Sequence, residues 1–164
     1  TRNMRNIIVI AHNIRSTYNV GSIFRTCEGF GVEKLILSGY TPYPLVKNDS
    51  RLPHITEKIT RQIHKTALGA EQLISFAYHE TLDLDHPDLA EYRLVALEQA
   101  PSSISLRDYR PPQNIALLIG EEVHGITTEL LAQVSDIIEI PMRGQKESFN
   151  VSVATGIALY ELSK

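Results

Sequence analysis

The segment that follows Met142 carries polar side chains at the density of a ligand site. Seven of the ten residues from Arg143 to Ser152 have side chains that can form hydrogen bonds, whereas an ordinary strand-to-helix connection needs one capping residue. Pro141 ends the apolar run before this segment, because it has no N–H for a β-ladder. We therefore expect a ligand-binding loop here, built from Arg143, Gln145, Lys146, Glu147, Ser148, Asn150 and Ser152.

Three other loops follow short apolar runs, after Ala11, Leu97 and Ile119. If these runs are parallel strands of one sheet, their carboxyl ends meet at the edge where such sheets bind ligands. The stretch after Ile119, Gly-Glu-Glu-Val-His-Gly, lacks the pattern of a dinucleotide-binding fingerprint and the lysine of a P-loop. Gly120 would still let a ligand approach the backbone, and Gly125 would permit a tight turn.

The elements that must position these loops alternate between strand and helix. Apolar β-branched runs predict strands, and periodic segments with capping residues predict helices, the first of which Asn19 is placed to cap. This alternation predicts an α/β fold, a mostly parallel sheet with helices on both faces. The predicted strands are 6–11, 34–38, 73–78, 93–97, 115–119 and 136–140, and the predicted helices are 20–30, 55–68, a short one ending near 92, one running to about 134, and 151–162.

The composition is that of a globular protein. At 164 residues, with 43% hydrophobic and 21% charged residues, the chain fits a single domain over residues 1–164 with one core. The longest apolar runs are strand-sized, so we expect neither a membrane span nor a signal peptide. The single cysteine, Cys27, excludes an internal disulfide and favours a reducing compartment, the cytoplasm.

Metal-dependent and nucleophilic hydrolase chemistry both lack their usual residue patterns. The six histidines show no HxxxH spacing and no CxxC pair is present, so no metal site is expected. Ser148 with His12 or His124 and a carboxylate would resemble a catalytic triad, but no serine lies in a Gly-x-Ser-x-Gly motif. Cys27 falls on the apolar face of the predicted helix 20–30, which favours a buried side chain over a nucleophile.

Charge is distributed unevenly along the chain, although the net charge is only −3. Residues 1–66 carry ten Lys and Arg against four Asp and Glu, whereas residues 67–164 carry six against fifteen. This asymmetry either reflects ordinary solvated surfaces or marks a surface that faces a polyanion. The loop 39–54 is long enough to be functional or mobile, and the helix predicted after it carries a basic stripe usable against phosphates. The stripe consists of Lys58, Arg61, His64 and Lys65.

Three stretches, taken together and in order, resemble the SpoU/TrmH branch of the SPOUT RNA methyltransferases. The first, residues 13–31, has an asparagine and then an Arg-Thr pair before an aromatic residue and a glycine. The second is Leu118-Ile-Gly-Glu-Glu-Val-His-Gly125, and the third is Ile140-Pro-Met-Arg-Gly-Gln-Lys-Glu-Ser-Phe-Asn-Val-Ser-Val-Ala154. Ala96-Leu97-Glu98 resembles a further element near the cofactor, and Phe149 stands where the family usually has leucine.

The resemblance implies a fold detail, a cofactor and an assembly that the residue patterns do not give by themselves. It implies a deep trefoil knot in the C-terminal segment, S-adenosylmethionine bound in that knot, and a homodimer. The knot rests on the family alone, because the rules for chain connections disfavour knots. By the family pattern, the residues that enclose the adenosyl group are Leu97, Gly120, Ile140, Met142, Ser148 and Phe149.

The implied reaction is methyl transfer from S-adenosylmethionine to a ribose 2′-hydroxyl of RNA, with Asn19, Arg25, Glu122, Ser148 and Asn150 on the family's catalytic positions. This chemistry needs an in-line approach, removal of the hydroxyl proton, and a phosphate that is held still. A guanidinium is effectively never deprotonated in proteins, so we expect Arg25 to bind phosphate and the developing alkoxide. Ser148 and Asn150 would hydrogen-bond the ribose. Glu122 would orient Arg25 or Asn19, or accept the proton.

RNA is the expected partner, and the basic half of the chain is the expected contact surface, with Arg15, Arg25, Arg61 and Lys65 as contacts. The chain has no room for the separate N-terminal RNA-recognition domain of many ribosomal RNA enzymes in this branch, which favours transfer RNA over ribosomal RNA. The alternative from another class is a non-catalytic RNA- or nucleotide-binding α/β module. Such a module would not need the full catalytic set, and binding of S-adenosylmethionine separates the two.

Overall fold

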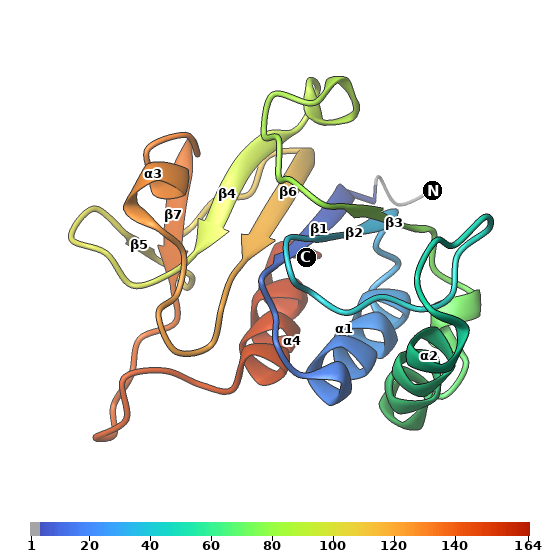
Figure 1. Ribbon diagram of the computed structural model, residues 1–164. Coiled ribbons are helices and arrows are strands. Elements are labelled where there is room, and N and C mark those ends of the chain that lie inside the picture. The colour runs from blue at the N-terminus through green and yellow to red at the C-terminus, as the bar shows by residue number, and fades with distance from the viewer. Residues whose placement is uncertain (1–3) are drawn as a thin grey trace.

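The computed structural model describes residues 4–164, which are built around one sheet of seven strands (Figure 1). The strand order is β3-β2-β1-β6-β4-β7-β5, and every neighbouring pair is parallel. The central strands β1 and β6 are buried almost throughout, as expected of a parallel sheet that is covered on both faces. The strands are β1 (Asn6–His12), β2 (Lys34–Ser38), β3 (Phe76–His79), β4 (Arg93–Leu97), β5 (Ile104–Ser105), β6 (Asn114–Ile119) and β7 (Asp136–Glu139).

Three long helices lie side by side on one face of the sheet, in the order α4, α1, α2 (Figure 1). They are α1 (Thr17–Gly29), α2 (Pro53–Ala67) and α4 (Val151–Leu162), close to the predicted ranges. Gly21 permits the close approach of α1 and α2, because a Cβ there would lie 2.2 Å from the carbonyl oxygen of Ile63. The apolar face of α1 packs into the main core beneath the sheet.

The opposite face of the sheet is covered by short elements and loops. The 3₁₀ helix η2 (Pro87–Leu89) and the single-turn helix α3 (Thr128–Leu131) pack a second apolar cluster against β1, β4 and β6. The predicted α/β fold with a parallel sheet is therefore confirmed, but the helix predicted to run to about 134 is only one turn long. The chain turns at Gly125, where φ is +70°, and α3 begins only after the N-cap Thr127.

Other predicted boundaries also need correction. The third strand, predicted over 73–78, begins only at Phe76 and is preceded by a second 3₁₀ helix, η1 (Ala70–Gln72). The strand β5 lies in a connection that was expected to hold no strand. Asn19 does not cap α1. The N-cap is Ser16, whose hydroxyl accepts a hydrogen bond from the backbone N–H of Asn19 at 3.1 Å. The Asn19 side chain is therefore free to make other contacts.

Cys27 is fully buried on α1, in agreement with its predicted place on the apolar face of that helix. Burial raises the pKa of its thiol to about 12, so the side chain is not a nucleophile at neutral pH. Along residues 4–164, no helix is both long enough and apolar enough to cross a membrane. Within the same range, no group of three or more His, Cys, Asp or Glu side chains is placed to hold a metal ion.

Candidate active site

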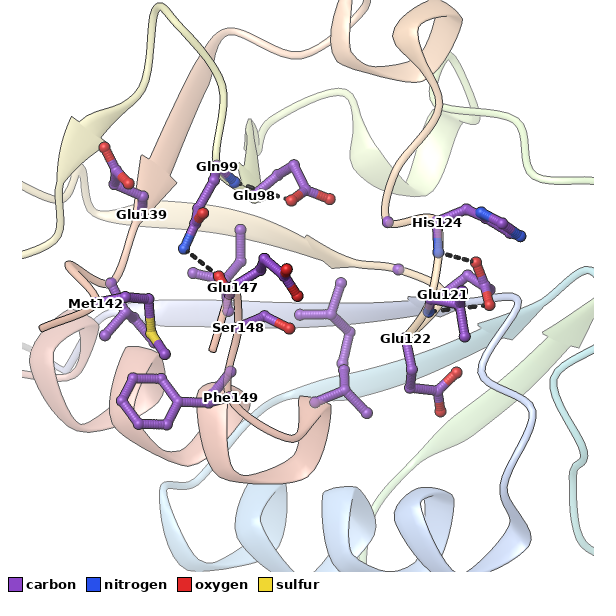
Figure 2. Close-up of a pocket in the computed structure, with 18 residues that line it drawn as sticks. Glu98, Gln99, Glu121, Glu122, His124, Glu139, Met142, Glu147, Ser148 and Phe149 are labelled. Atoms are coloured by element: carbon purple, nitrogen blue, oxygen red, sulfur yellow. Dashed lines mark hydrogen bonds between the residues drawn. The ribbon is translucent and has the colours of Figure 1, made fainter. Parts of the chain in front are cut away.

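A cavity of about 300 Å³ lies at the carboxyl edge of the sheet, where β4, β6 and β7 end. Its volume is at the lower end of the range for small-molecule sites. The loop after β4, the loop after β6, the segment 139–149 and the first turn of α4 form its walls. Figure 2 shows Met142 and Phe149 at one end of this cavity and Glu121, Glu122 and His124 at the other.

All six residues predicted to enclose a cofactor line this cavity. They come from separate segments that the parallel sheet brings to one edge, which is why their positions in sequence are far apart. The sequence did not single out several other lining residues as site residues. These are Gln99, Glu121, His124 and Glu139, whereas the predicted ones are Leu97, Gly120, Ile140, Met142, Ser148 and Phe149.

Glu98 joins the loop after β4 to the loop after β6. One carboxylate oxygen accepts a hydrogen bond from the backbone N–H of Ile126 at 2.9 Å, and the other accepts from the N–H of Gln99 at 2.9 Å. Gly125 makes this arrangement possible, because a Cβ there would lie 2.1 Å from the Glu98 carboxylate. Both glycines of the loop after β6 are therefore required by close packing, since a Cβ at Gly120 would lie 2.5 Å from the Ile126 side chain.

The adjacent carboxylates Glu121 and Glu122 have different surroundings. The carboxylate of Glu121 is turned back onto its own loop and accepts hydrogen bonds from the backbone N–H groups of Val123 and His124 at 3.1 and 2.5 Å. Burial acts to raise the pKa of Glu121, but the hydrogen bonds from His124 and Val123 outweigh it and lower that pKa. Glu121 therefore shapes the loop, and Glu122 remains available to face α1.

A chain of hydrogen bonds links Asn150, Asn19 and Glu122 at the edge of the cavity. The amide of Asn150 donates to the Asn19 side-chain oxygen at 3.4 Å, and the amide of Asn19 donates to a Glu122 oxygen at 3.3 Å. The other Glu122 oxygen accepts the backbone N–H of Arg15 at 3.5 Å. Three of the five predicted catalytic residues are thus connected, and Ser148 lines the same cavity.

Asn150 also has a structural role that its place in the motif did not reveal. It is the N-cap of α4, and its side-chain oxygen accepts hydrogen bonds from the backbone N–H and the hydroxyl of Ser152 at 2.9 and 2.6 Å. The carboxamide oxygen is therefore occupied by hydrogen bonds to the first turn of α4. Only the amide nitrogen, whose contact with Asn19 is long, remains for a substrate.

Arg25 is the predicted catalytic residue that lies apart from the others. It is exposed on α1 and does not line the cavity, and its side chain makes no hydrogen bond or ion pair to any residue between 4 and 164. Within one chain, Glu122 therefore contacts Asn19 and not Arg25. The remaining predicted RNA contacts are also exposed outside the cavity, Arg15 in the loop after β1 and Arg61 and Lys65 on α2.

A sequence profile of the SpoU rRNA Methylase family matches residues 6–160. The chain belongs to the SpoU methylase family. Among its relatives in this family is the tRNA (guanosine(18)-2′-O)-methyltransferase of Aquifex aeolicus (strain VF5), at 30% identity over 168 residues. That match covers 99% of this chain and 71% of the relative. The resemblance drawn from the three motifs is therefore confirmed.

Solved SpoU/TrmH-type structures have the same fold. An AdoMet-bound rRNA methyltransferase from Sinorhizobium meliloti superposes with a TM-score of 0.80 at 26% identity, covering 96% of this chain and 55% of that one. The A. aeolicus TrmH/SpoU tRNA modifying enzyme superposes with a TM-score of 0.78 at 25% identity, covering 97% and 74%. The chain thus spans about half of the first protein and about three quarters of the second.

The chemistry of the cavity fits S-adenosylmethionine. The side chains of Ile140, Met142 and Phe149 provide an apolar wall of the kind that encloses an adenine ring. The carboxylates at the other end suit the positive charges of a sulfonium and an amine. Gly120 leaves its backbone open beside this wall, where any side chain would collide with Ile126.

Proposed function

We propose that the chain transfers a methyl group from S-adenosylmethionine to a ribose 2′-hydroxyl of RNA. The observation that carries the proposal is that the cofactor-sized cavity and the Asn150, Asn19 and Glu122 hydrogen-bond chain meet at one edge of the sheet. Family membership supports the same reaction, because the relatives are named as tRNA or rRNA methyltransferases. In this proposal residues 1–164 act as one methyltransferase domain.

When bound, S-adenosylmethionine supplies an electrophilic methyl group. Leu97, Ile140, Met142 and Phe149 would hold the adenosine through their apolar side chains. Ser148 lies on the same wall and donates or accepts a hydrogen bond at the ribose hydroxyl. The chain therefore contributes mainly orientation, which suits a reaction that needs an in-line approach.

Glu122 accepts the proton of the 2′-hydroxyl in this mechanism. Glu98 and Glu121 use both of their carboxylate oxygens on backbone N–H groups, so they are poorly placed to act as bases. The contacts of Glu122, at 3.3 and 3.5 Å, are long enough to be exchanged for a substrate hydroxyl. Asn19 then holds the carboxylate in position. We expect Glu122→Gln to lower kcat for methyl transfer by about 100-fold or more, because the variant has lost the group that accepts the proton.

We infer that the working form is a homodimer that completes the site. A groove between α1 and α4 is lined by apolar side chains, among them Val153 and Tyr160, which are 50% and 70% exposed. Exposed apolar surface of this kind marks protein interfaces. Phe149 lines both the groove and the cofactor cavity, so the two are continuous. A second copy on this face would bring Arg25 of one chain toward the cavity of the other, where its guanidinium binds phosphate.

Complementation between inactive variants tests this arrangement. We expect Arg25→Ala and Ser148→Ala each to lose most methyl transfer, and a mixture of the two to regain part of it, because a mixed dimer holds one intact site. If Arg25 acts within its own chain, the mixture stays inactive. Val153→Asp places a charge in the apolar groove, so this variant should sediment as a monomer. If Arg25→Ala turns over within a few-fold of wild type, Arg25 has no central role in the reaction.

Transfer RNA is the substrate class that we propose. The support is that a relative named as a tRNA methyltransferase matches 99% of this chain at 30% identity. Transfer of labelled methyl groups into total RNA, followed by size separation and nucleoside mapping, tests both the reaction and the substrate. Label confined to ribosomal RNA would contradict the substrate, and a base rather than a ribose product would contradict the reaction.

Titration calorimetry with S-adenosylmethionine distinguishes this enzyme from a non-catalytic RNA- or nucleotide-binding module. We expect a single site per chain, and Met142→Asp should remove the heat of binding because it places a charge in the apolar wall. Absence of binding by the wild-type dimer would favour the binding module. Arg143→Ala, in the exposed part of the same loop, is the matched control.

We also propose that the C-terminal segment forms a trefoil knot and that the protein works in the cytoplasm. The knot is supported by family membership and by topology, because β7 lies beyond β4 in the sheet while the following helix α4 returns to pack on α1. An experimental main-chain trace tests it directly. The cytoplasm is supported by the single, buried Cys27, which suits a reducing compartment.

A further inference from the structure

Tyr40 presents an exposed aromatic ring beside the site, and none of the roles above uses it. The residue follows β2 and is 52% exposed. The guanidinium carbon of Arg15 lies 5.9 Å from the centre of the ring, within the range of a cation–π contact. The backbone N–H of the same Arg15 is hydrogen-bonded to Glu122. A single residue therefore connects the ring to the carboxylate edge of the candidate active site.

Contacts between the loops after β1 and β2 fix the backbone at Tyr40. The side-chain oxygen of Asn13 accepts the backbone N–H of Tyr40 at 3.0 Å. Asn13 and Gly39 both adopt left-handed conformations, with φ of +56° and +66°, and a Cβ at Gly39 would lie 1.9 Å from the Asn13 side chain. The hydroxyl of Thr41 donates to the carbonyl of Ala11 at 3.0 Å. The ring is thus exposed while its backbone is anchored.

The remainder of the loop 39–54 is anchored as well, so its length does not make it a free segment. Arg51 lies 3.6 Å over the ring of Tyr43, which stacks on Tyr78 of β3 at 3.8 Å. The guanidinium of Arg51 also donates to both carboxylate oxygens of Asp49 at 2.9 and 2.6 Å, and the hydrogen bonds from Arg51 hold the pKa of that carboxyl well below its usual range. A ligand that binds to Tyr40 therefore meets a surface that needs little ordering.

We propose that Tyr40, with Arg15 beside it, is a stacking platform for the nucleobase next to the methylated nucleotide. The inference rests on the proposed function, because it takes the ligand to be RNA. An anchored aromatic face offers the contact on which unstacked bases bind, and the neighbouring guanidinium offers a partner for the adjoining phosphate. Since Arg15 spans from the ring to Glu122, the stacked base is a neighbour of the nucleotide whose ribose reaches Glu122.

Substitutions that separate a ring from simple apolar bulk test the platform. Loss of one base stack typically weakens binding about 5- to 100-fold, so we expect Tyr40→Ala and Tyr40→Leu to raise the KM for RNA by that factor. The kcat and the Kd for S-adenosylmethionine should stay within about two-fold, and Tyr40→Phe should behave as wild type. A KM unchanged in Tyr40→Leu, or a Phe variant as weak as the Ala variant, would overturn the proposal.

Fluorescence provides a second readout that does not depend on turnover. The chain contains no tryptophan, so Tyr40→Trp introduces a single reporter whose emission a stacked base quenches. Leu73→Trp is the matched control, because Leu73 is 74% exposed and precedes β3 at the opposite, amino edge of the sheet. With unfractionated transfer RNA as the probe, we expect quenching of the first reporter and little change in the second.

The outcomes separate this inference from the proposed function. If the wild-type protein methylates RNA but the Tyr40→Trp reporter is not quenched, or is quenched no more than the Leu73→Trp reporter, the platform is wrong and the enzyme remains. If the wild-type protein neither binds RNA nor transfers a methyl group to it, both are overturned.

Discussion

Neighbouring residues of the same type have different roles at this site, and hydrogen-bond partners separate them. Both oxygens of Glu121 accept backbone N–H groups of its own loop, whereas Glu122 is held by Asn19 and Arg15 at longer distances. A carboxylate with strong backbone partners stabilises a loop, because exchanging those partners for a ligand is costly. A carboxylate with long contacts can exchange them for a substrate hydroxyl.

The hydrogen bond between Asn19 and Glu122 can be tested by substitution. Asn19 is connected to the cavity through Glu122 and does not line it, so Asn19→Ala should lower kcat and leave the Kd for S-adenosylmethionine within about three-fold. A double-mutant cycle with Glu122→Ala should show a coupling free energy of about 1 kcal/mol in kcat/KM, as for contacting residues. Additive effects of the two substitutions would mean that Asn19 acts independently of the carboxylate.

Gly125 gives a second prediction at the same scale, with Gly144 as its control. Alanine at Gly125 meets both a left-handed backbone, φ +70°, and the Glu98 carboxylate, whereas alanine at Gly144 has nothing within 4 Å. We expect Gly125→Ala to destabilise the loop by about 1–3 kcal/mol and to weaken S-adenosylmethionine binding, measured by thermal unfolding and calorimetry. Gly144→Ala should match wild type in both, and equal behaviour of the two variants would count against the packing argument.

The sequence could predict residues of the cavity wall but not the hydrogen bonds that hold that wall in place. The wall residues fall where apolar runs end, and a parallel sheet gathers those ends at one edge. The pairing of Glu98 with Ile126 and the capping role of Asn150 depend on loop conformations that leave no periodic signal. Asn19 is not the cap of α1, because Ser16, three residues earlier, accepts the hydrogen bond from a backbone N–H at that end of the helix.

At the scale of elements, β4 and β7 carry two of the three strand ends that surround the cavity, and side chains join these strands at the opposite edge of the sheet. Arg93 of β4 donates two hydrogen bonds to Asp136 of β7 at 2.6 and 3.0 Å, and the hydroxyl of Tyr109 donates to the same carboxylate at 2.6 Å. The hydrogen bond from Arg93 lowers the pKa of Asp136, with Tyr109 acting in the same direction. This cluster ties the connection 98–114 to the sheet.

Removing that carboxylate tests the cluster. Asp136→Asn should reduce the free energy of unfolding by about 1–3 kcal/mol at neutral pH, since it weakens charge-assisted hydrogen bonds. Because the folded-state pKa is lowered, the wild-type advantage is present above pH about 4 and is lost as pH falls below the ordinary aspartate pKa. Asp88→Asn removes an exposed partner of Lys34 and should change stability by less than about 1 kcal/mol. Denaturant unfolding at several pH values measures both.

The elements themselves were predictable to different degrees. The buried strands β1, β2, β4 and β6 and the three long helices have strong apolar patterns, and their predicted ranges agree with the structure to within a few residues. The short elements η1, η2, α3 and β5 have no strong apolar pattern, because each is defined by one or two local contacts. The covering of the second sheet face is therefore the part of the fold that patterning described least well.

At the scale of the whole molecule, the basic half of the sequence lies together in one region of the fold. The basic half contributes α1, the loop 39–54 and α2, which adjoin the carboxyl edge where Asn19 and Glu122 meet. An anion that reaches the site thus passes over a surface whose charge is opposite to that of the chain as a whole. We propose that this arrangement steers RNA to the site without requiring a positive net charge.

Charge reversal tests that surface. Arg61 and Lys65 are exposed on α2 and lie outside the cofactor cavity, so Arg61→Glu with Lys65→Glu should weaken RNA binding at low salt by ten-fold or more. The slope of log K against log salt should fall by about two, one for each phosphate contact that is lost. Affinity for S-adenosylmethionine should not change. The measurements are filter binding of transfer RNA at several salt concentrations and calorimetry with the cofactor.

A matched reversal at the other edge of the sheet distinguishes a local surface from net charge. Arg110 is exposed and lies close to the amino end of β6, so Arg110→Glu changes the total charge as much as Arg61→Glu does, but at the opposite edge. If RNA lies across α2, only Arg61→Glu lowers the affinity and the salt slope, because counterions are released only where phosphates are contacted. If both single variants lose affinity equally, binding follows net charge and the α2 surface has no particular role.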